Sequence, residues 1–238
     1  MKALKNIMAR MGYDIKRIDK APMTLYENDE IFWQLYKKAM GKTQMESDNF
    51  LRQQRHYLLL ELLKNTDIQR GNIAECGCFR GLSAYQIATR LKERGFKKKF
   101  YLFDSFEGLS TFDKKDLSDY VADYDSRRKE FACSEDIVRG NLNEFNFIEY
   151  KKGWIPNRFN EVSEDTFVFV HIDVDLYEPT KQALEFFYPR VLKDGVIVFD
   201  DYGFLGFPGA KQAVDEFMRD KKDFFISLPS SNAFLIKD

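Results

Sequence analysis

The clearest pattern in the chain is a pair of short apolar runs that both end in aspartate. Residues 167–172 and 196–199 are rich in β-branched and aromatic side chains, and they run directly into Asp173 and into Asp200 with Asp201. Continuous apolar runs of this length are typical of parallel strands buried on both faces. The pattern therefore predicts two core strands, each ending at a polar site.

The segment between these strands has the pattern of a crossover helix. Pro179 suits a first helical turn, Gly195 suits a C-cap, and apolar residues recur between them at helical spacing: Ala183, Leu184, Phe187, Val191 and Leu192. A strand, crossover helix and strand place both strand ends at one edge of the sheet, so the three aspartates should converge there. A single aspartate at a strand end often caps a helix or a turn, but three together repel one another, and a divalent cation is the simplest relief.

The rest of the pattern predicts strands and helices in alternation, as in an α/β fold. Helical spacing over 27–40, with Ile31 and Phe32 on the apolar face, and over 48–63 predicts two helices that cover one end of the sheet. The later segments are a strand, turn and helix over 72–91, a strand and turn over 99–108, helices at 135–145 and 208–219, a strand at 147–150, and a terminal hairpin of strands at 224–228 and 233–236.

A glycine turn at Gly77 and Gly81 links the first of these strands to its helix. Glycine lets the backbone approach a ligand there, and the helix N-terminus offers free N–H groups. A dinucleotide-binding fingerprint starting at Gly77 would need glycine where Phe79 and Leu82 stand, so a dehydrogenase is disfavoured. Asp104, at the end of the second strand, is well placed to accept the ribose hydroxyls of a nucleotide-like cofactor.

Two more features should lie at the same edge of the sheet. Residues 110–134 are highly charged and interleaved with aromatic residues, and a connection this long is a functional lid or a disordered loop; we interpret it as a lid. Gly153 and Trp154 follow the third strand, where the indole would stack on a cofactor base or pack in the core.

Composition and charge set the remaining bounds. The 238 residues are 44% hydrophobic, enough for one large core, and we expect an N-terminal helical extension over 1–66 followed by one domain over 67–238. A formal net charge of −1 gives no indication of nucleic-acid binding. The apolar runs are far shorter than the roughly 20 residues of a transmembrane helix. Residues 1–20 carry an excess of basic side chains, which suits a membrane surface or an acidic partner, or equally an arm packed on the body or on a second subunit.

The three cysteines bear on compartment and metal chemistry. Cys76 and Cys78 are too close together for a usual zinc knuckle and lack a second pair, so we interpret them as packed thiols. With Cys133 the count is odd, and no signal-peptide pattern is present, so we expect a reducing, cytoplasmic location.

Five motifs, taken in order, carry a resemblance to a known family. They are AECGCFRGLSA, FDSFEG, KKGW, HIDVDLYEPT and VIVFDDY, and over about residues 72–218 the chain resembles the macrocin O-methyltransferase family. The resemblance implies an α/β class I methyltransferase fold: a Rossmann-like, mostly parallel sheet with an antiparallel C-terminal strand and helices on both faces. This chain departs from the family at Leu82, where members commonly have a second glycine.

The resemblance also implies a chemistry. It implies S-adenosylmethionine as methyl donor, Mg²⁺ or another divalent cation such as Mn²⁺ on Asp173, Asp200 and Asp201, and Asp173 or His171 as the proton acceptor. The expected cofactor-binding residues are Glu75, Gly77, Gly81, Ser83, Asp104, Ser105, Phe106, Gly153 and Trp154. The expected substrate is a hydroxyl of a small sugar, free or nucleotide-linked, and we expect a homo-oligomer.

Three other functions stay open on the sequence. The first is an O-methyltransferase for a catechol or another phenol. The second is a metal-dependent phosphotransferase, suggested by Asp173 and Asp175 after an apolar strand, although Tyr177 stands where that signature wants threonine or valine. The third is a non-catalytic nucleotide-binding protein, for which three convergent carboxylates would be a costly arrangement.

Overall fold

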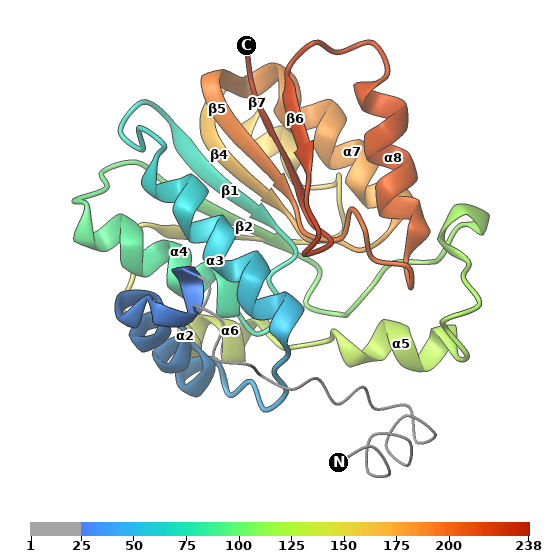
Figure 1. The fold of residues 1–238 in the computed structure, drawn as a ribbon, viewed down its shortest axis with the longest axis horizontal. Coiled ribbons are helices and arrows are strands. Elements are labelled where there is room, and N and C mark those ends of the chain that lie inside the picture. The colour runs from blue at the N-terminus through green and yellow to red at the C-terminus, as the bar shows by residue number, and fades with distance from the viewer. Residues whose placement is uncertain (1–24) are drawn as a thin grey trace, which may run out of the picture.

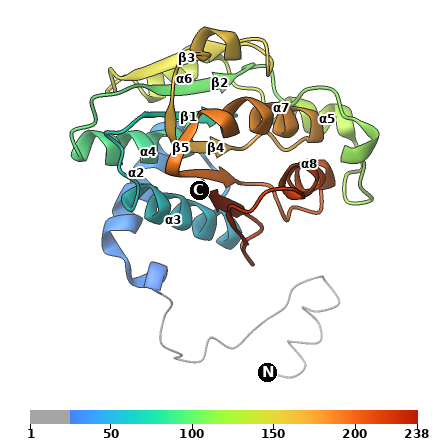
Figure 2. The same ribbon diagram turned by 90° about the horizontal axis from the view of Figure 1, so that it is seen from above.

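The fold is a single seven-stranded sheet between two layers of helices (Figure 1). The computed structural model describes residues 25–238, so the basic arm at 1–20 lies outside the described residues. The strands run in the order β3-β2-β1-β4-β5-β7-β6, and Figure 2 shows the first five of these in succession from above. Their bounds are β1 Asn72–Cys76, β2 Phe100–Asp104, β3 Ile148–Lys152, β4 Phe167–Ile172, β5 Val191–Phe199, β6 Phe224–Ser227 and β7 Ala233–Ile236.

Strands β1 to β5 pair in parallel, and only β7 is reversed. It pairs antiparallel with β5 on one side and with β6 on the other, so the predicted terminal hairpin is confirmed. The predicted mostly parallel sheet with an antiparallel C-terminal strand is confirmed with it. Because the order reverses between β1 and β4, the edge beyond these two strands is where a ligand would be expected.

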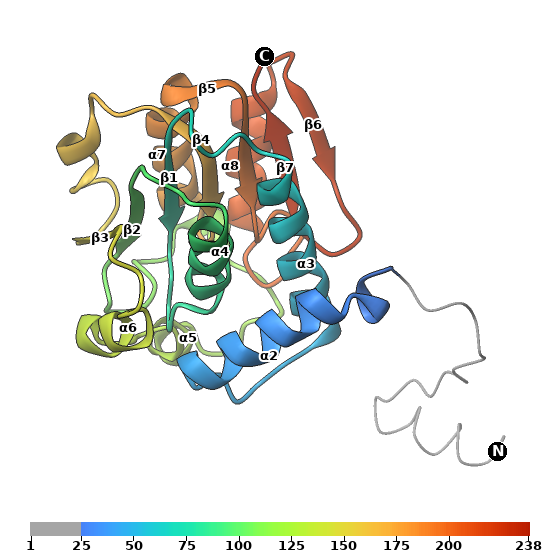
Figure 3. The ribbon, with the colours of Figure 1, turned by 90° about the vertical axis from the view of Figure 1, so that its left-hand side faces the viewer.

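Successive side chains of a strand point to opposite faces of the sheet, and each face has its own hydrophobic core. In β2, Phe100 and Leu102 pack with the helices of one layer, whereas Tyr101 and Phe103 pack with those of the other. The first layer, in front in Figure 3, holds α2 Glu30–Thr43, α3 Phe50–Lys64, α4 Leu82–Glu93 and α6 Glu135–Asn141. The second holds α7 Tyr177–Phe187 and α8 Pro208–Met218. Helices α2 and α3 therefore share one continuous core with the sheet.

Three details of the predicted helices are wrong. Helix α7 ends at Phe187, and Val191 and Leu192 belong to β5 rather than to the helix. Gly195, the expected C-cap, also lies within β5. Pro189 explains this, because it has no N–H for a further helical turn, and the chain instead forms a 3-10 turn over Tyr188–Arg190. Ile31 is 65% exposed and does not lie on the buried face of α2.

The segment 110–134 is largely ordered by packing. It contains a 3-10 turn at Lys114–Asp116 and helix α5 at Tyr124–Glu130. Phe112, Val121 and Phe131 pack against a small buried cluster formed by Leu109, Leu176 and Phe207. The segment thus lies against the N-terminal ends of α7 and α8.

Two absences can be stated for the part of the chain that the structure describes. All three cysteines are buried and unpaired with one another, which confirms the interpretation of Cys76 and Cys78 as packed thiols. Within residues 25–238, no helix combines the length and apolarity needed to span a bilayer.

Candidate active site

The aspartates are held in place because backbone pairing continues beyond the strands. The Asp173 N–H donates to the Cys76 carbonyl at 2.9 Å, and the Asp200 N–H donates to the Ile172 carbonyl at 3.0 Å. The polar residues after β4 and β5 therefore sit on a rigid edge of the sheet, as the crossover argument predicts.

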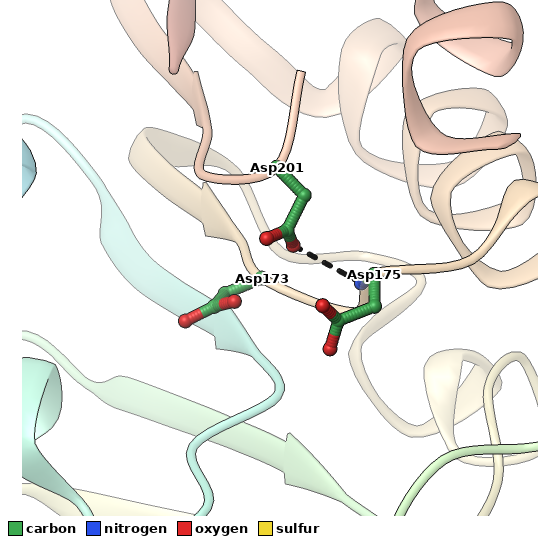
Figure 4. Close-up of side chains that lie close together, drawn as sticks. All are labelled: Asp173, Asp175 and Asp201. Carbon is green, nitrogen blue, oxygen red and sulfur yellow. Dashed lines mark hydrogen bonds between the residues drawn. The ribbon is translucent and has the colours of Figure 1, made fainter. Parts of the chain in front are cut away.

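Three carboxylates converge at this edge (Figure 4). One oxygen each from Asp173, Asp175 and Asp201 lies within 4.8 Å of the others, close enough to share one metal ion. Asp175 has a left-handed backbone, with φ 59°, and its N–H donates to Asp201 Oδ2 at 3.1 Å. Asp175 was not among the metal ligands expected from the sequence. We call Asp173, Asp175 and Asp201 the acid cluster.

Asp200 is turned towards a different partner. Its Oδ2 lies 3.1 Å from Arg55 Nε, in an ion pair whose two side chains are only 12% and 17% exposed. Its Oδ1 lies 3.7 Å from His171 Nε2. In this structure Asp200 therefore bridges α3 and β4, while the acid cluster forms without it.

The charges of the site follow from these neighbours. Burial, and then the surrounding carboxylates, raise the pKa values of Asp173 and Asp175 well above their usual range, and raise the pKa of Asp201 to about 6. Burial acts on Asp200 in the same direction, but Arg55 and His171 outweigh it and hold the pKa of Asp200 below its usual range. The acid cluster thus has an excess of negative charge that a cation or protons must relieve.

His171 lies beneath the acid cluster, in a buried pair with Glu75. His171 Nδ1 is 2.8 Å from Glu75 Oε1, and the two side chains are 2% and 0% exposed. Burial opposes a charged imidazole, but the Asp200 and Glu75 carboxylates outweigh it and raise the pKa of His171 to about 10. The second carboxylate oxygen, Glu75 Oε2, is buried and has no hydrogen-bond partner among the described residues.

The glycine turn is fixed against both neighbouring strand ends. Gly77 has φ 82°, and a Cβ there would overlap the carbonyl oxygen of Asp173. Asp104 Oδ2 accepts from the N–H groups of Cys78 at 2.7 Å and Phe79 at 3.2 Å, and its Oδ1 accepts from the Phe106 N–H at 2.7 Å. Asp104 therefore orders the turn, and its Oδ1 keeps one lone pair free for a ligand, whereas both lone pairs of Oδ2 are used by the turn.

One cavity connects the turn with the acid cluster. Its volume is about 540 Å³, within the range of small-molecule sites. Of the predicted site residues, the following line it: Gly77, Ser83, Asp104, Ser105, Gly153, Trp154, Asp173, Asp200 and Asp201. Glu75 and His171 lie beneath it. Gly81 and Phe106 do not line it: Gly81 precedes α4 as its N-cap, and Phe106 is 7% exposed and belongs to the core.

One wall of the cavity was not expected from the sequence. Helix α3 contributes Arg52, Arg55 and His56. The sequence held a signal for this wall, because Asn49, Arg52 and His56 recur at helical spacing in a helix that was expected only to cover one end of the sheet. The segment 110–134, which was expected at this edge as a lid, contributes Arg127 and Phe131.

Comparison with solved structures identifies the class of fold. The O-methyltransferase NovP superposes with a TM-score of 0.67 at 24% identity, covering 77% of this chain and 79% of that one. The sheet order, the reversed β7 and this likeness define a class I methyltransferase fold.

The sequence then identifies the family. A profile of macrocin-O-methyltransferases (TylF) matches residues 39–226, and the chain belongs to this family. It is similar to demethyldecarbamoylnovobiocin O-methyltransferase of Streptomyces niveus, at 28% identity over 153 residues, or 62% of this chain and 58% of the relative. It is also similar to 8-demethyl-8-(2,3-dimethoxy-alpha-L-rhamnosyl)-tetracenomycin-C 4'-O-methyltransferase of Streptomyces olivaceus, at 26% over 141 residues, or 56% of this chain and 53% of the relative. The matches thus span little more than half of each curated relative.

Proposed function

We propose that the protein transfers a methyl group from S-adenosylmethionine to a hydroxyl of a small sugar, with the help of a divalent cation. The observation that carries this proposal is the single cavity that joins the glycine turn to the acid cluster. Methyl transfer is an in-line displacement, so donor and acceptor oxygen need adjoining sites in one enclosed space. Family membership supports the reaction, and the rhamnosyl substrate named for the Streptomyces olivaceus relative supports a sugar as acceptor.

The turn fits the proposed cofactor. Glu75 Oε2, beneath the cavity, is a buried acceptor that has no partner among residues 25–238, as expected for a group that binds the ammonium of a methionine moiety. Asp104 Oδ1 has a lone pair left for a ribose hydroxyl, and Trp154 borders the same cavity. S-adenosylmethionine supplies an activated methyl group, and these residues would bind and orient it.

The acid cluster fits a hard cation. Its donors are all oxygens and repel one another, which favours Mg²⁺ or Mn²⁺ over zinc. Such an ion, if held by these carboxylates, would make a nearby acceptor hydroxyl more acidic. Asp173 and Asp201 belong both to the acid cluster and to the ligand set expected from the family. The two sets differ in their third member, which is Asp175 in the acid cluster and Asp200 in the expected set.

His171 and Asp173 have different roles in the proposed proton transfer. The raised pKa of His171 keeps its imidazole protonated, so it balances the charges of Glu75 and Asp200 and is a poor proton acceptor. Asp173, which lines the cavity, is the group that we propose takes the acceptor proton. We propose that segment 110–134 limits the access of water to the reacting groups.

The test is methyl transfer itself. The purified protein is incubated with methyl-labelled S-adenosylmethionine, Mg²⁺ and a panel of nucleoside diphosphate 6-deoxyhexoses, free sugars and catechols, and products are identified by mass spectrometry. The proposal expects label on a sugar and none after chelation. Label on a catechol alone would overturn the sugar assignment, and full activity after chelation would overturn the role of the cation.

A further inference from the structure

One buried carboxylate joins the segment 110–134 to the start of helix α7. Asp116 is 1% exposed, and its Oδ1 accepts from the backbone N–H of Tyr177 at 2.7 Å. Its Oδ2 accepts from the Asp113 N–H at 2.8 Å. Tyr177 is the first residue of α7, so Asp116 caps that helix from 61 positions away.

This long-range cap contrasts with the caps of other helices in the molecule. Helices α2 and α3 are capped from within, by Asp29 on the Phe32 N–H and by Asn49 on the Arg52 N–H. The residue before α7 is Leu176, whose side chain cannot accept a hydrogen bond. The start of α7 therefore depends on the distant segment for a bond that a local Ser, Asp or Asn would normally supply.

Helix α8 leaves room for the same carboxylate. A Cβ at Gly209 would overlap Asp116 Oδ1 and would come within 2.8 Å of Tyr177 Cβ. Gly209 is in the first turn of α8, directly after Pro208. The carboxylate thus occupies a site enclosed by the ends of two helices.

Further contacts fasten the segment on both sides of Asp116. Lys115 Nζ lies 3.4 Å from the centroid of the Tyr177 ring, and the Tyr177 hydroxyl donates to Glu216 Oε2 of α8 at 2.6 Å. Ser118 Oγ donates to the Leu205 carbonyl at 2.7 Å. These contacts all converge on the chain that leads into α7 and α8.

The acid cluster lies at the other end of the same short stretch. Only Leu176 separates Tyr177 from Asp175, whose own N–H donates to Asp201 Oδ2. One end of the stretch 175–177 is therefore held by the acid cluster and the other by Asp116. We propose that Asp116 is a positioning residue: by fastening the segment 110–134 to α7, it holds the loop that carries Asp173 and Asp175 in the geometry of the acid cluster. The proposal rests on the proposed function only in that methyl transfer is the reaction thereby served.

Backbone hydrogen exchange, measured by NMR on the full chain, tests this without any turnover. In Asp116→Ala, and in Gly209→Ala, which disturbs the carboxylate from the other side, the amides of both Tyr177 and Asp175 should exchange about tenfold faster. Asp116→Asn keeps an oxygen for the Tyr177 N–H and should restore most of the protection. Asp119→Ala, at an exposed position of the same segment, and Gly140→Ala, where a Cβ meets nothing within 4 Å, are the matched controls.

The exchange rates at Tyr177 and Asp175 test the helix cap and the positioning role separately. Unchanged exchange at Tyr177 in both Asp116→Ala and Gly209→Ala would overturn the cap. Faster exchange at Tyr177 with unchanged exchange at Asp175 would overturn the positioning role and leave a helix cap only. A protein that fails to transfer methyl groups would defeat the proposed function, and the exchange at the two amides would still decide this one.

Discussion

At the residue scale, Gly77 shows how closely the glycine turn and the acid cluster are built together. Its φ of 82° costs other residues about 1–2 kcal/mol, and a Cβ would also overlap the Asp173 carbonyl oxygen. We predict that Gly77→Ala lowers the free energy of unfolding by about 2–4 kcal/mol, measured by urea denaturation. Gly95→Ala is the control, because Gly95 has φ 62° but no atom within 4 Å of its Cβ position, and it should lose only about 1 kcal/mol. Equal losses would show that the contact with Asp173 is unimportant.

The third carboxylate of the cation site can also be decided residue by residue. The geometry favours Asp175, since Asp200 is paired with Arg55. We predict that Asp175→Asn and Asp201→Asn each weaken Mn²⁺ binding at least about tenfold, and that Asp200→Asn weakens it less. Electron paramagnetic resonance of free Mn²⁺ measures these affinities directly. A loss in Asp200→Asn as large as in Asp201→Asn would restore the ligand set expected from the family.

At the scale of elements, helix α3 is part of the site through Arg55. Replacing Arg55 by Met removes one of the two cationic partners of the buried Asp200 and leaves only His171, so we predict a loss of about 1–3 kcal/mol in the free energy of unfolding at pH 7. The pKa of Asp200 is lowered on folding, so its ionised form stabilises the native state above the unfolded pKa, and this contribution disappears as pH falls. The loss caused by Arg55→Met should therefore shrink towards pH 3.

A variant on the same helix provides the control. The Arg52 guanidinium donates to the Ser47 carbonyl on an exposed surface, so Arg52→Met should cost less than about 1 kcal/mol, with little dependence on pH. Urea denaturation at several pH values measures both variants. A loss in Arg55→Met that is independent of pH would mean that Arg55 contributes by packing rather than by its charge.

The elements that the sequence predicted well are those with a strong local signal. The β4 strand and the aspartates after it could be read directly, because buried parallel strands are continuously apolar and polar residues gather where they end. Val191 and Leu192 were wrongly placed in the helix, since their apolar spacing also fits a helix, and Pro189 ends the helix before them. The pairing of Arg55 with Asp200 could not be predicted from a local sequence pattern, because it depends on how α3 packs against the edge of the sheet.

At the scale of the whole molecule, the carboxylates of the site make stability depend on pH in an unusual direction. The pKa values of Asp173, Asp175 and Asp201 are raised on folding, so the native state binds more protons than the unfolded chain between about pH 4 and pH 6. Stability then falls as pH rises through this window. Asp200 has already reached its full contribution above the unfolded pKa. His56 acts in the opposite direction, because burial lowers its pKa to about 3 and its neutral form adds stability as pH rises towards 6.5. The contribution of the carboxylates is therefore the difference between the wild-type protein and a variant that lacks one of them.

A bound cation should remove that penalty, which gives a prediction for the intact protein. Without metal, we expect the free energy of unfolding of the wild-type protein to fall by about 1–3 kcal/mol between pH 5 and pH 8 relative to that of Asp201→Asn, and Mg²⁺ to stabilise the wild-type protein in proportion to RT ln(1 + [Mg²⁺]/Kd). The gain from Mg²⁺ should vanish below about pH 5, where protons already neutralise the cluster. Asp201→Asn should flatten the pH dependence and reduce the gain, because it removes one of the mutually repelling charges along with one of the ligands. Urea denaturation with Mg²⁺ or with a chelator, at each pH, measures all of these quantities. A metal-free wild-type protein whose pH dependence matches that of Asp201→Asn would contradict the mutual repulsion of the carboxylates from which we infer the cation site.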